Sequence, residues 1–180
     1  MPQYIVKAYL NCTRCPLCKI RKNIVFGRGV LPAKVMFVGE APGKSEDVLA
    51  QAFVGPSGRL LNKAMETAAF MASTSIPTFF ITNIVACRPA DNSGGENRKP
   101  TGEEAWTCWR RLEQTYKDVS PQKVVLLGAV AEQYGIDAWP DATILPHPAF
   151  ILRQGGTSSP AFRAFARGLS EVFMEVMRIV

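Results

Sequence analysis

Residues 34–43, KVMFVGEAPG, join an apolar run over Lys34–Gly39 to a short loop with glycine at either end. Three other segments are similarly rich in Val, Ile, Leu or Phe, namely Thr78–Val85, Lys123–Gly128 and Ala142–Leu145. Short apolar runs that end at Gly, Pro or polar residues are typical of buried strands. These four segments are therefore predicted to be the strands of the core.

Segments with helical patterns separate and follow these strands. Thr101 followed by Glu104 is a capping-box pattern that opens a helix running to about Tyr116, and Ser159-Pro160 is typical of another helix start. The helix predicted over Ser57–Phe70 and the helix after Pro160 each carry an apolar stripe, made by Leu60, Leu61, Ala64, Met65 and Ala68 and by Phe162, Phe165, Leu169, Val172, Phe173, Val176 and Met177. Alternating strands and helices favour parallel strands joined by right-handed crossovers. The predicted fold class is α/β, a three-layer α/β/α sandwich around a small, mainly parallel four-stranded sheet.

Length and composition narrow the class of protein. A chain of 180 residues with 47% hydrophobic content can bury one core and is short for two, so we expect a single domain over residues 1–180. It has neither a continuous apolar run of membrane-span length nor an apolar secretory start, so we expect a cytoplasmic protein without membrane association. We also expect a monomer. The net charge of +6 is compatible with nucleic acid, with an acidic partner or with neither.

The five cysteines favour a metal or cluster site. An odd number of cysteines in a chain that we expect to be intracellular argues against a disulfide framework. Cys12, Cys15 and Cys18 form a CxxCxxC run, and Cys87 and Cys108 lie far downstream. Zinc and a [4Fe–4S] cluster both accept four thiolates, so the residue types leave the choice open. In either case we expect a structural role, tying the N-terminal segment 1–30 to the domain.

Polar and glycine-rich features gather where the predicted strands end. In open α/β sheets, ligands bind beyond the carboxyl ends of the strands. The loop Gly39–Gly43 follows the first predicted strand, Asn83 lies toward the end of the second, and His147, the only histidine, follows the last. We therefore expect these three features to form a ligand site.

Taken in order, the motifs of the chain resemble those of the iron–sulfur type, or family 4, uracil-DNA glycosylases. The resemblance spans most of the chain and is carried by Cys12-Thr-Arg-Cys15, Phe26-Gly-Arg-Gly29, Gly39-Glu-Ala-Pro-Gly43, Glu46-Asp47, Phe53-Val-Gly55, Ile81-Thr-Asn-Ile-Val85, Cys87-Arg-Pro89, Asn97-Arg-Lys-Pro100, Cys108 and His147-Pro-Ala149. It implies a monofunctional DNA-repair enzyme that hydrolyses the N-glycosidic bond of uracil in single- or double-stranded DNA and leaves an abasic site. It also implies a [4Fe–4S] cluster held by Cys12, Cys15, Cys87 and Cys108, with Cys18 as a spare thiol.

A uracil-DNA glycosylase must swing the base out of the DNA stack into a pocket, and the candidate residues are expected to form that pocket. A neutral His147 would donate a hydrogen bond to a carbonyl of the departing base and stabilise its negative charge. The carboxamide of Asn83 offers a donor and an acceptor that match uracil and mismatch cytosine. Phe53 would stack on the base, while the backbone of the loop formed by Gly39, Ala41, Pro42 and Gly43 would approach it closely.

The acidic and DNA-contacting candidates follow from the same resemblance. Glu46 would border the pocket and exclude the methyl group of thymine, and Glu40 would support the loop. Ala41 stands where another glycosylase family has a water-activating Asp, so no general base is evident. After the histidine, Phe150–Leu152 could wedge into the stack and Arg153 could meet phosphate, with Leu152 and Arg153 as the predicted DNA contacts. Burial of Ile151 and Leu152 in the core is equally compatible with the sequence. Further phosphate contacts are predicted from Arg88, Arg98, Lys99, Arg163 and Arg167.

The chain departs from the family pattern in three places. About five additional residues separate Pro89 from Asn97, and the segment Gly135–Pro146 is shorter, so that a hairpin before His147 is missing. Ala50 and Ala52 replace a Gly and a Pro that usually precede Phe53. The shortened segment bears most directly on substrate preference, because it precedes a loop expected to touch DNA.

Other functions are compatible with the same residues. A glycosylase of this fold could act on another deaminated or modified base, which assays on a panel of oligonucleotides would reveal. A catalytically idle DNA-binding module would bind DNA without producing abasic sites. A zinc-containing nucleotide-binding protein would be colourless when purified, whereas an iron–sulfur protein is brown.

Overall fold

The computed structural model describes residues 8–178, which contain a five-stranded sheet in the order β1-β3-β2-β4-β5. The strands are β1 (Arg28–Gly29), β2 (Val35–Gly39), β3 (Phe79–Asn83), β4 (Lys123–Leu127) and β5 (Thr143–Leu145). Strands β2 to β5 pair in parallel, which confirms the predicted sheet, and β1 runs antiparallel to β3. The prediction missed β1 because two residues are too few to produce a recognisable pattern. Residues 1–7 of the predicted domain and of its N-terminal segment lie outside the described part.

In the described part of the chain, α-helices lie between and beyond the strands. They are α2 (Lys44–Leu49), α3 (Pro56–Met71), α4 (Gly102–Val119), α5 (Ala129–Gly135), α6 (Pro148–Arg153) and α7 (Pro160–Arg178), with short 3-10 turns η1 (Pro16–Lys19) and η2 (Gly156–Ser158). The three long helices confirm the predicted helical segments. The helices α2, α5 and α6, of six or seven residues, were not predicted, because so short a segment shows less than two turns of periodicity.

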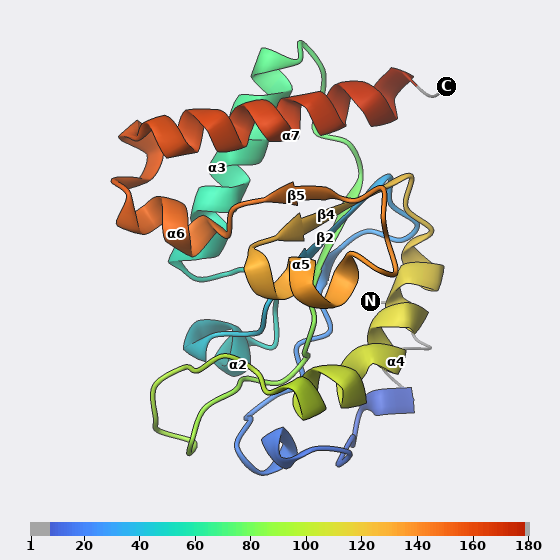
Figure 1. The fold of residues 1–180 in the computed structure, drawn as a ribbon, viewed down its shortest axis with the longest axis vertical. Coiled ribbons are helices and arrows are strands. Elements are labelled where there is room, and N and C mark those ends of the chain that lie inside the picture. The colour runs from blue at the N-terminus through green and yellow to red at the C-terminus, as the bar shows by residue number, and fades with distance from the viewer. Residues whose placement is uncertain (1–7, 179–180) are drawn as a thin grey trace.

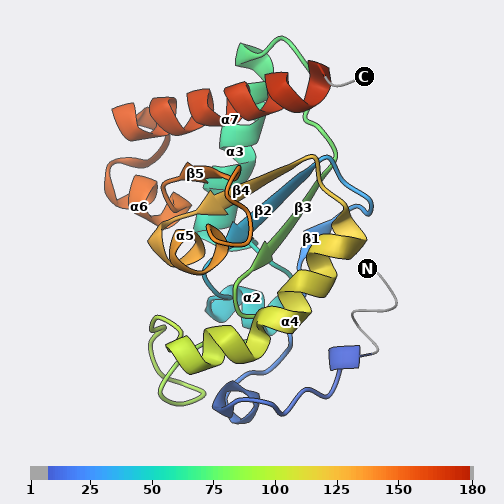
Figure 2. The same ribbon diagram turned by 45° about the vertical axis from the view of Figure 1, so that its right-hand side comes forward.

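The helices cover both faces of the sheet, as predicted for a three-layer sandwich (Figures 1 and 2). Along β2, Val35 and Phe37 belong to the core beneath α3, α6 and α7, whereas Met36 and Val38 belong to the core beneath α4 and α5. The strand therefore buries both of its faces, which explains why its sequence is continuously apolar instead of alternating. None of the described helices is long and apolar enough to cross a membrane.

The start of α4 confirms the capping-box prediction and anchors the preceding loop. The Thr101 hydroxyl accepts a hydrogen bond from the Glu104 backbone N–H at 3.2 Å, and the Glu104 carboxylate accepts one from the Thr101 N–H at 2.8 Å. Arg98 also donates to both carboxylate oxygens of Glu104, at 2.9 and 2.7 Å. One buried glutamate thus fixes the end of the polar loop 90–101 to the helix that carries Cys108.

The strand order places a ligand-binding position above β2 and β4. The chain leaves β2 through α3 to reach β3 on one side, and then crosses through α4 to reach β4 on the other side. Loops that leave neighbouring strands in opposite directions open a crevice at their carboxyl ends. Gly128, which follows β4 with φ of +89°, lets the His147 backbone approach, because a Cβ at this position would lie 2.8 Å from the Cβ of His147.

Candidate active site

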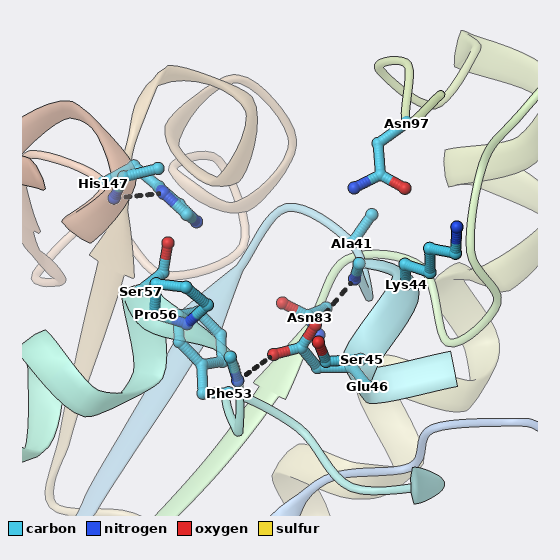
Figure 3. A pocket seen from close by; sticks show the side chains of 13 residues that line it. Ala41, Lys44, Ser45, Glu46, Phe53, Pro56, Ser57, Asn83, Asn97 and His147 are labelled. Carbon is cyan, nitrogen blue, oxygen red and sulfur yellow. Dashed lines mark hydrogen bonds between the residues drawn. The ribbon is translucent and has the colours of Figure 1, made fainter. Parts of the chain in front are cut away.

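A cavity of about 360 Å³ lies at the carboxyl ends of the parallel strands. Its lining comes from the loop after β2, from α2, from the start of α3, from the end of β3 and from the two loops that carry Asn97 and His147 (Figure 3). The predicted site residues that line it are Ala41, Gly43, Glu46, Phe53, Asn83 and His147. Gly39, Glu40, Pro42, Leu152 and Arg153 are outside this lining.

Gly39 does not line the cavity, but it leaves room for two residues that do. It pairs with Asn83 across β2 and β3, and a Cβ on Gly39 would lie 2.6 Å from both the Asn83 Oδ1 and the Phe53 Cζ. A side chain at this position would therefore displace both groups. The glycine lets the carboxamide and the phenyl ring meet over the end of β2, although it does not itself line the cavity.

Asn83 is the most unusual polar group of the cavity. The residue is 1% exposed, and neither its Oδ1 nor its Nδ2 has a hydrogen-bond partner within the described structure. A buried amide without partners costs on the order of 1–3 kcal/mol, so such groups are rare in the absence of a functional reason. The carboxamide is free to pair with a ligand that offers one acceptor and one donor side by side.

Phe53 adopts a backbone conformation that is unfavourable for a bulky residue. Its φ is +53°, and its ring centroid lies 5.9 Å from that of His147. The surroundings hold it in place: Arg28 donates to the carbonyl of Ala52 at 2.8 Å, and Gly58 leaves room for the Phe53 carbonyl, which would lie 1.7 Å from a Cβ at position 58. Strain of this kind is concentrated at functional sites, where it fixes a side chain in one orientation.

His147 is the N-cap of α6, and this position fixes its tautomer. Its Nδ1 accepts a hydrogen bond from the Ala149 backbone N–H at 3.1 Å, so the proton of the neutral ring is on Nε2. The pKa of His147 is lowered to about 4, mainly by burial and also by the positive charge of Arg153, while the negative charge of Glu46 opposes the shift. At neutral pH the ring is therefore an uncharged hydrogen-bond donor through Nε2.

Glu46 ties two walls of the cavity together. Its Oε1 accepts hydrogen bonds from the N–H groups of Val54 at 3.0 Å and Gly55 at 2.7 Å, and its Oε2 accepts one from Gly43 at 3.2 Å. The carboxylate thus holds the loop after β2 against the loop that carries Phe53. Glu40 does not reach the cavity, and burial raises the pKa of its carboxyl group while the positive charge of Lys99 opposes the rise.

The residues after His147, which the sequence analysis considered as an apolar wedge, form α6. Ile151 is fully buried in the core, whereas Phe150 is 44% and Leu152 37% exposed. The central residue of the predicted wedge is therefore excluded from contact with DNA, because helical spacing turns it inward. Phe150, Leu152 and the exposed Arg153 remain on the outer side of the helix.

Lys44, Ser45, Ser57 and Asn97 also line the cavity, and the sequence analysis did not single them out as site residues. Asn97 lies opposite His147 in Figure 3 and accepts a hydrogen bond from the Arg88 Nε at 2.6 Å. The Asn97-Arg-Lys-Pro100 motif was the sequence feature that could have identified Asn97 as a site residue.

Arg88 is buried and does not reach a phosphate-binding surface. It is 2% exposed and also donates to the backbone carbonyls of Ser93 and Gly95, so its predicted role at such a surface is wrong.

Four cysteines line a second, smaller cavity, which the N-terminal segment, the loop after β3 and α4 enclose. Cys12, Cys15, Cys87 and Cys108 all line it, and Cys18 does not. Arg21 donates to the Cys87 Sγ at 3.5 Å and to the Cys12 carbonyl at 2.7 Å. Among residues 8–178, no three His, Cys, Asp or Glu side chains are grouped closely enough to hold a single metal ion.

The chemistry of these thiols fits a metal-containing group. Burial raises the pKa of Cys87 to about 12, with the charge of Arg21 opposing the rise, and burial also raises the pKa of Cys15. Buried thiols of this kind become thiolates when metal coordination compensates the negative charge. The four cysteines, which come from the N-terminal segment, the loop after β3 and α4, are the residues that could hold a cluster.

The tautomer and low pKa of His147 can be tested directly, because the chain has only one histidine. A long-range ¹H–¹⁵N NMR titration is expected to show a neutral ring protonated on Nε2 from pH 8 down to about 5, with a midpoint near pH 4. Since the unfolded chain binds a proton near pH 6.5, the free energy of unfolding should decrease as the pH falls from 6.5 to 4. Arg153→Gln should raise the midpoint, and a midpoint at or above 6.5 in the unmodified protein would contradict this account.

Comparison with known proteins agrees with this geometry. The model of the family described as the Uracil DNA glycosylase superfamily matches residues 26–169. The Type-4 uracil-DNA glycosylase of Pyrobaculum aerophilum is 40% identical over 121 residues, which are 67% of this chain and 57% of that protein. Those of Thermotoga maritima and Archaeoglobus fulgidus are 36% and 35% identical, over 71% and 72% of this chain and 62% and 61% of their own lengths.

The aligned part of this chain thus spans less than two thirds of these relatives. The family match nevertheless includes the sheet, the loop after β2 and the residues Phe53, Asn83 and His147, which line one cavity. The chain belongs to the uracil-DNA glycosylase superfamily.

Proposed function

We propose that this protein hydrolyses the N-glycosidic bond of uracil in DNA and leaves an abasic site. The observation that carries the proposal is the unpaired carboxamide of Asn83, which meets Phe53 and His147 at one cavity. Uracil offers a ring N–H beside a carbonyl, which is the pattern that an Asn carboxamide can complement. Cytosine presents a ring acceptor beside an amino group, so a carboxamide held in the orientation that fits uracil would have both of its groups mismatched.

The proposed chemistry depends on stabilising the base as it leaves. Cleavage of the bond between the sugar carbon and the base nitrogen leaves an oxocarbenium-like sugar and a base with negative charge. The Nε2–H of a neutral His147 donates to a base carbonyl, and this hydrogen bond strengthens as that charge develops. The low pKa of His147 keeps the ring as a donor that does not hand over its proton.

The remaining groups orient the reactants. Phe53, held at positive φ, provides a flat surface on which the extruded base stacks. A water adds to the sugar carbon as the bond to the base nitrogen breaks, and the proton that the water loses neutralises the departing base. The carboxylate of Glu46 is already engaged by three backbone N–H groups, so it is not the group that activates this water. Glu46 therefore shapes the pocket that excludes thymine. Glu40 has only an indirect role, through the backbone of the loop.

The DNA would be held around the mouth of this cavity. The exposed Phe150 and Leu152 on α6 lie next to His147 in the chain and can fill the gap left by a flipped base. The neighbouring Arg153 is exposed and can contact phosphate. We further propose that the protein acts as a single-domain, cytoplasmic monomer.

We also propose that Cys12, Cys15, Cys87 and Cys108 bind a [4Fe–4S] cluster. Supporting this are the cavity that these four thiols share and the exclusion of Cys18 from its lining. The cluster would supply structural cross-linking, joining the N-terminal segment to α4 and to the loop after β3. None of these cysteines lines the base pocket, so their role in catalysis would be to hold the scaffold.

The first prediction concerns His147. Incubation with uracil-containing DNA is expected to produce alkali-labile strand breaks, and His147→Ala should lower kcat by about 100- to 1,000-fold because one hydrogen bond to the leaving base is lost. The melting temperature and the iron content should stay close to those of the unmodified protein. An unchanged rate in this variant would remove His147 from the mechanism.

The same assay separates the alternatives. Strand breaks on DNA with another deaminated or modified base, and none on uracil, would indicate a glycosylase of different specificity. DNA binding without strand breaks on any substrate in the panel would indicate a catalytically idle module.

The second prediction concerns base recognition by Asn83. Asn83→Asp removes the amide donor, so the excision of uracil is expected to fall and the preference for uracil over cytosine to narrow. Competition between strands that carry the two bases measures this preference. Asn97→Asp is the matched control, because it makes the same change on the opposite wall of the cavity and should leave the preference as it is. Equal effects of the two variants on base preference would argue against the role of Asn83.

The third prediction concerns the four cysteines. Cys108→Ser should abolish the brown colour and the bound iron and sulfide, whereas Cys18→Ser should retain them, because Cys18 lies outside the thiol-lined cavity. The iron and acid-labile sulfide bound per chain provide the measurement. Zinc in place of iron in the purified protein, or loss of iron in Cys18→Ser, would overturn the assignment.

A further inference from the structure

Arg111 on α4 is a buried cation without a carboxylate partner. It is 1% exposed, and it takes part in none of the ion pairs found among residues 8–178. Burying a guanidinium away from water costs several kcal/mol unless hydrogen bonds and a nearby negative charge compensate for the loss of hydration. Other groups near Arg111 must therefore stabilise its buried charge.

The hydrogen bonds of Arg111 join β3 to the cysteine cavity. Its Nη1 donates to the Thr82 hydroxyl at 3.0 Å, and its Nη2 donates to the backbone carbonyls of Asn83 at 2.7 Å and Ile84 at 2.8 Å. The same Nη2 lies 3.7 Å from the Cys108 Sγ. One side chain thus contacts both a cysteine of the thiol-lined cavity and the backbone of the residue whose carboxamide faces the base pocket.

The hydrogen-bond acceptors around Arg111 only partly compensate the positive charge of its guanidinium group. The three oxygen acceptors are neutral, and the Arg111 Nε has no partner. Arg111 lines the cavity of the four cysteines, and Arg21 donates to Cys87 on the same cavity. Four thiolates bound to an iron–sulfur cluster would place negative charge next to both guanidinium groups.

We propose that Arg111 is a positioning residue that fixes Asn83 for base recognition, with its charge balanced by the four-cysteine centre. This inference rests on the proposed function, because it assigns the base-reading role to Asn83. The cluster and the base pocket are then coupled through a single side chain, and a change at the cysteines alters the backbone carbonyl on which the orientation of Asn83 depends.

Two substitutions separate the charge of Arg111 from its hydrogen bonds. Arg111→Gln removes the charge and most of the donors, whereas Arg111→Lys keeps the charge but cannot reach all three oxygen acceptors at once. In iron-loaded protein, Arg111→Gln should move the reduction potential of the cluster to a more negative value, because a nearby cation favours the reduced form. Arg111→Lys should leave the potential nearer to that of the unmodified protein.

The two variants should share an effect on base recognition. Both are expected to raise KM for uracil-containing DNA by about tenfold, the effect of losing about one charge-assisted hydrogen bond, and to change kcat less. Both should also shift the NMR resonances of the Asn83 side-chain amide, which is measured without substrate. Arg110→Lys is the matched control, because Arg110 is the neighbouring exposed residue on the same helix and should alter none of these quantities.

An unchanged potential in Arg111→Gln, or unchanged Asn83 resonances in both variants, would overturn the proposal. If Arg111→Gln fails to bind iron, the Asn83 amide resonances and the KM of Arg111→Lys still test whether Arg111 positions Asn83. A protein that cleaves no uracil-containing DNA would refute the proposed function, while the potential and the amide resonances would still report whether Arg111 couples the two sites.

Discussion

The unpaired carboxamide of Asn83 is the constraint on which the site depends. The residue ends β3, where parallel pairing with β2 sets it opposite Gly39. Because Gly39 has no side chain, the carboxamide and the Phe53 ring can approach each other over the end of β2. Leaving both amide atoms without partners costs the folded protein on the order of 1–3 kcal/mol for each group, and that cost is recovered when a complementary ligand binds.

Backbone strain is concentrated in the same region. Phe53 and Ala50 both have φ of +53°. A left-handed conformation costs a residue with a Cβ about 1–2 kcal/mol, so the alanine makes this segment less favourable than a glycine would. Hydrogen bonds from Val54 and Gly55 to Glu46, and from Arg28 to Ala52, hold the segment despite this cost. Rigid support around Phe53 is what allows a strained stacking surface to persist.

Local sequence patterns predicted the sheet and the long helices, because their signals are periodic and lie within one segment. The rule that ligands bind at the carboxyl ends of the strands predicted Asn83 and His147 as site residues, and the resemblance added Phe53. All three line one cavity, although their tasks remain predictions. What could not be predicted depends on contacts between distant segments. From the sequence, Arg88 was predicted to be a surface cation. It is buried instead, because the polar loop 90–101 folds over it and accepts hydrogen bonds from it through the carbonyls of Ser93 and Gly95. The inward turn of Ile151 follows only once α6 is known to be a helix.

The placement of His147 also explains how its electrostatics serve the site. As the N-cap of α6, it accepts a hydrogen bond from the Ala149 N–H through Nδ1 and keeps its proton on Nε2. Arg153, at the end of the same short helix, adds positive charge that disfavours the imidazolium form. A ring that stays neutral binds a departing anion through a hydrogen bond without competing for a proton. Burial of the ring, with the added charge of Arg153, therefore keeps it neutral, and its N-cap position on α6 sets the tautomer and the direction of the donor.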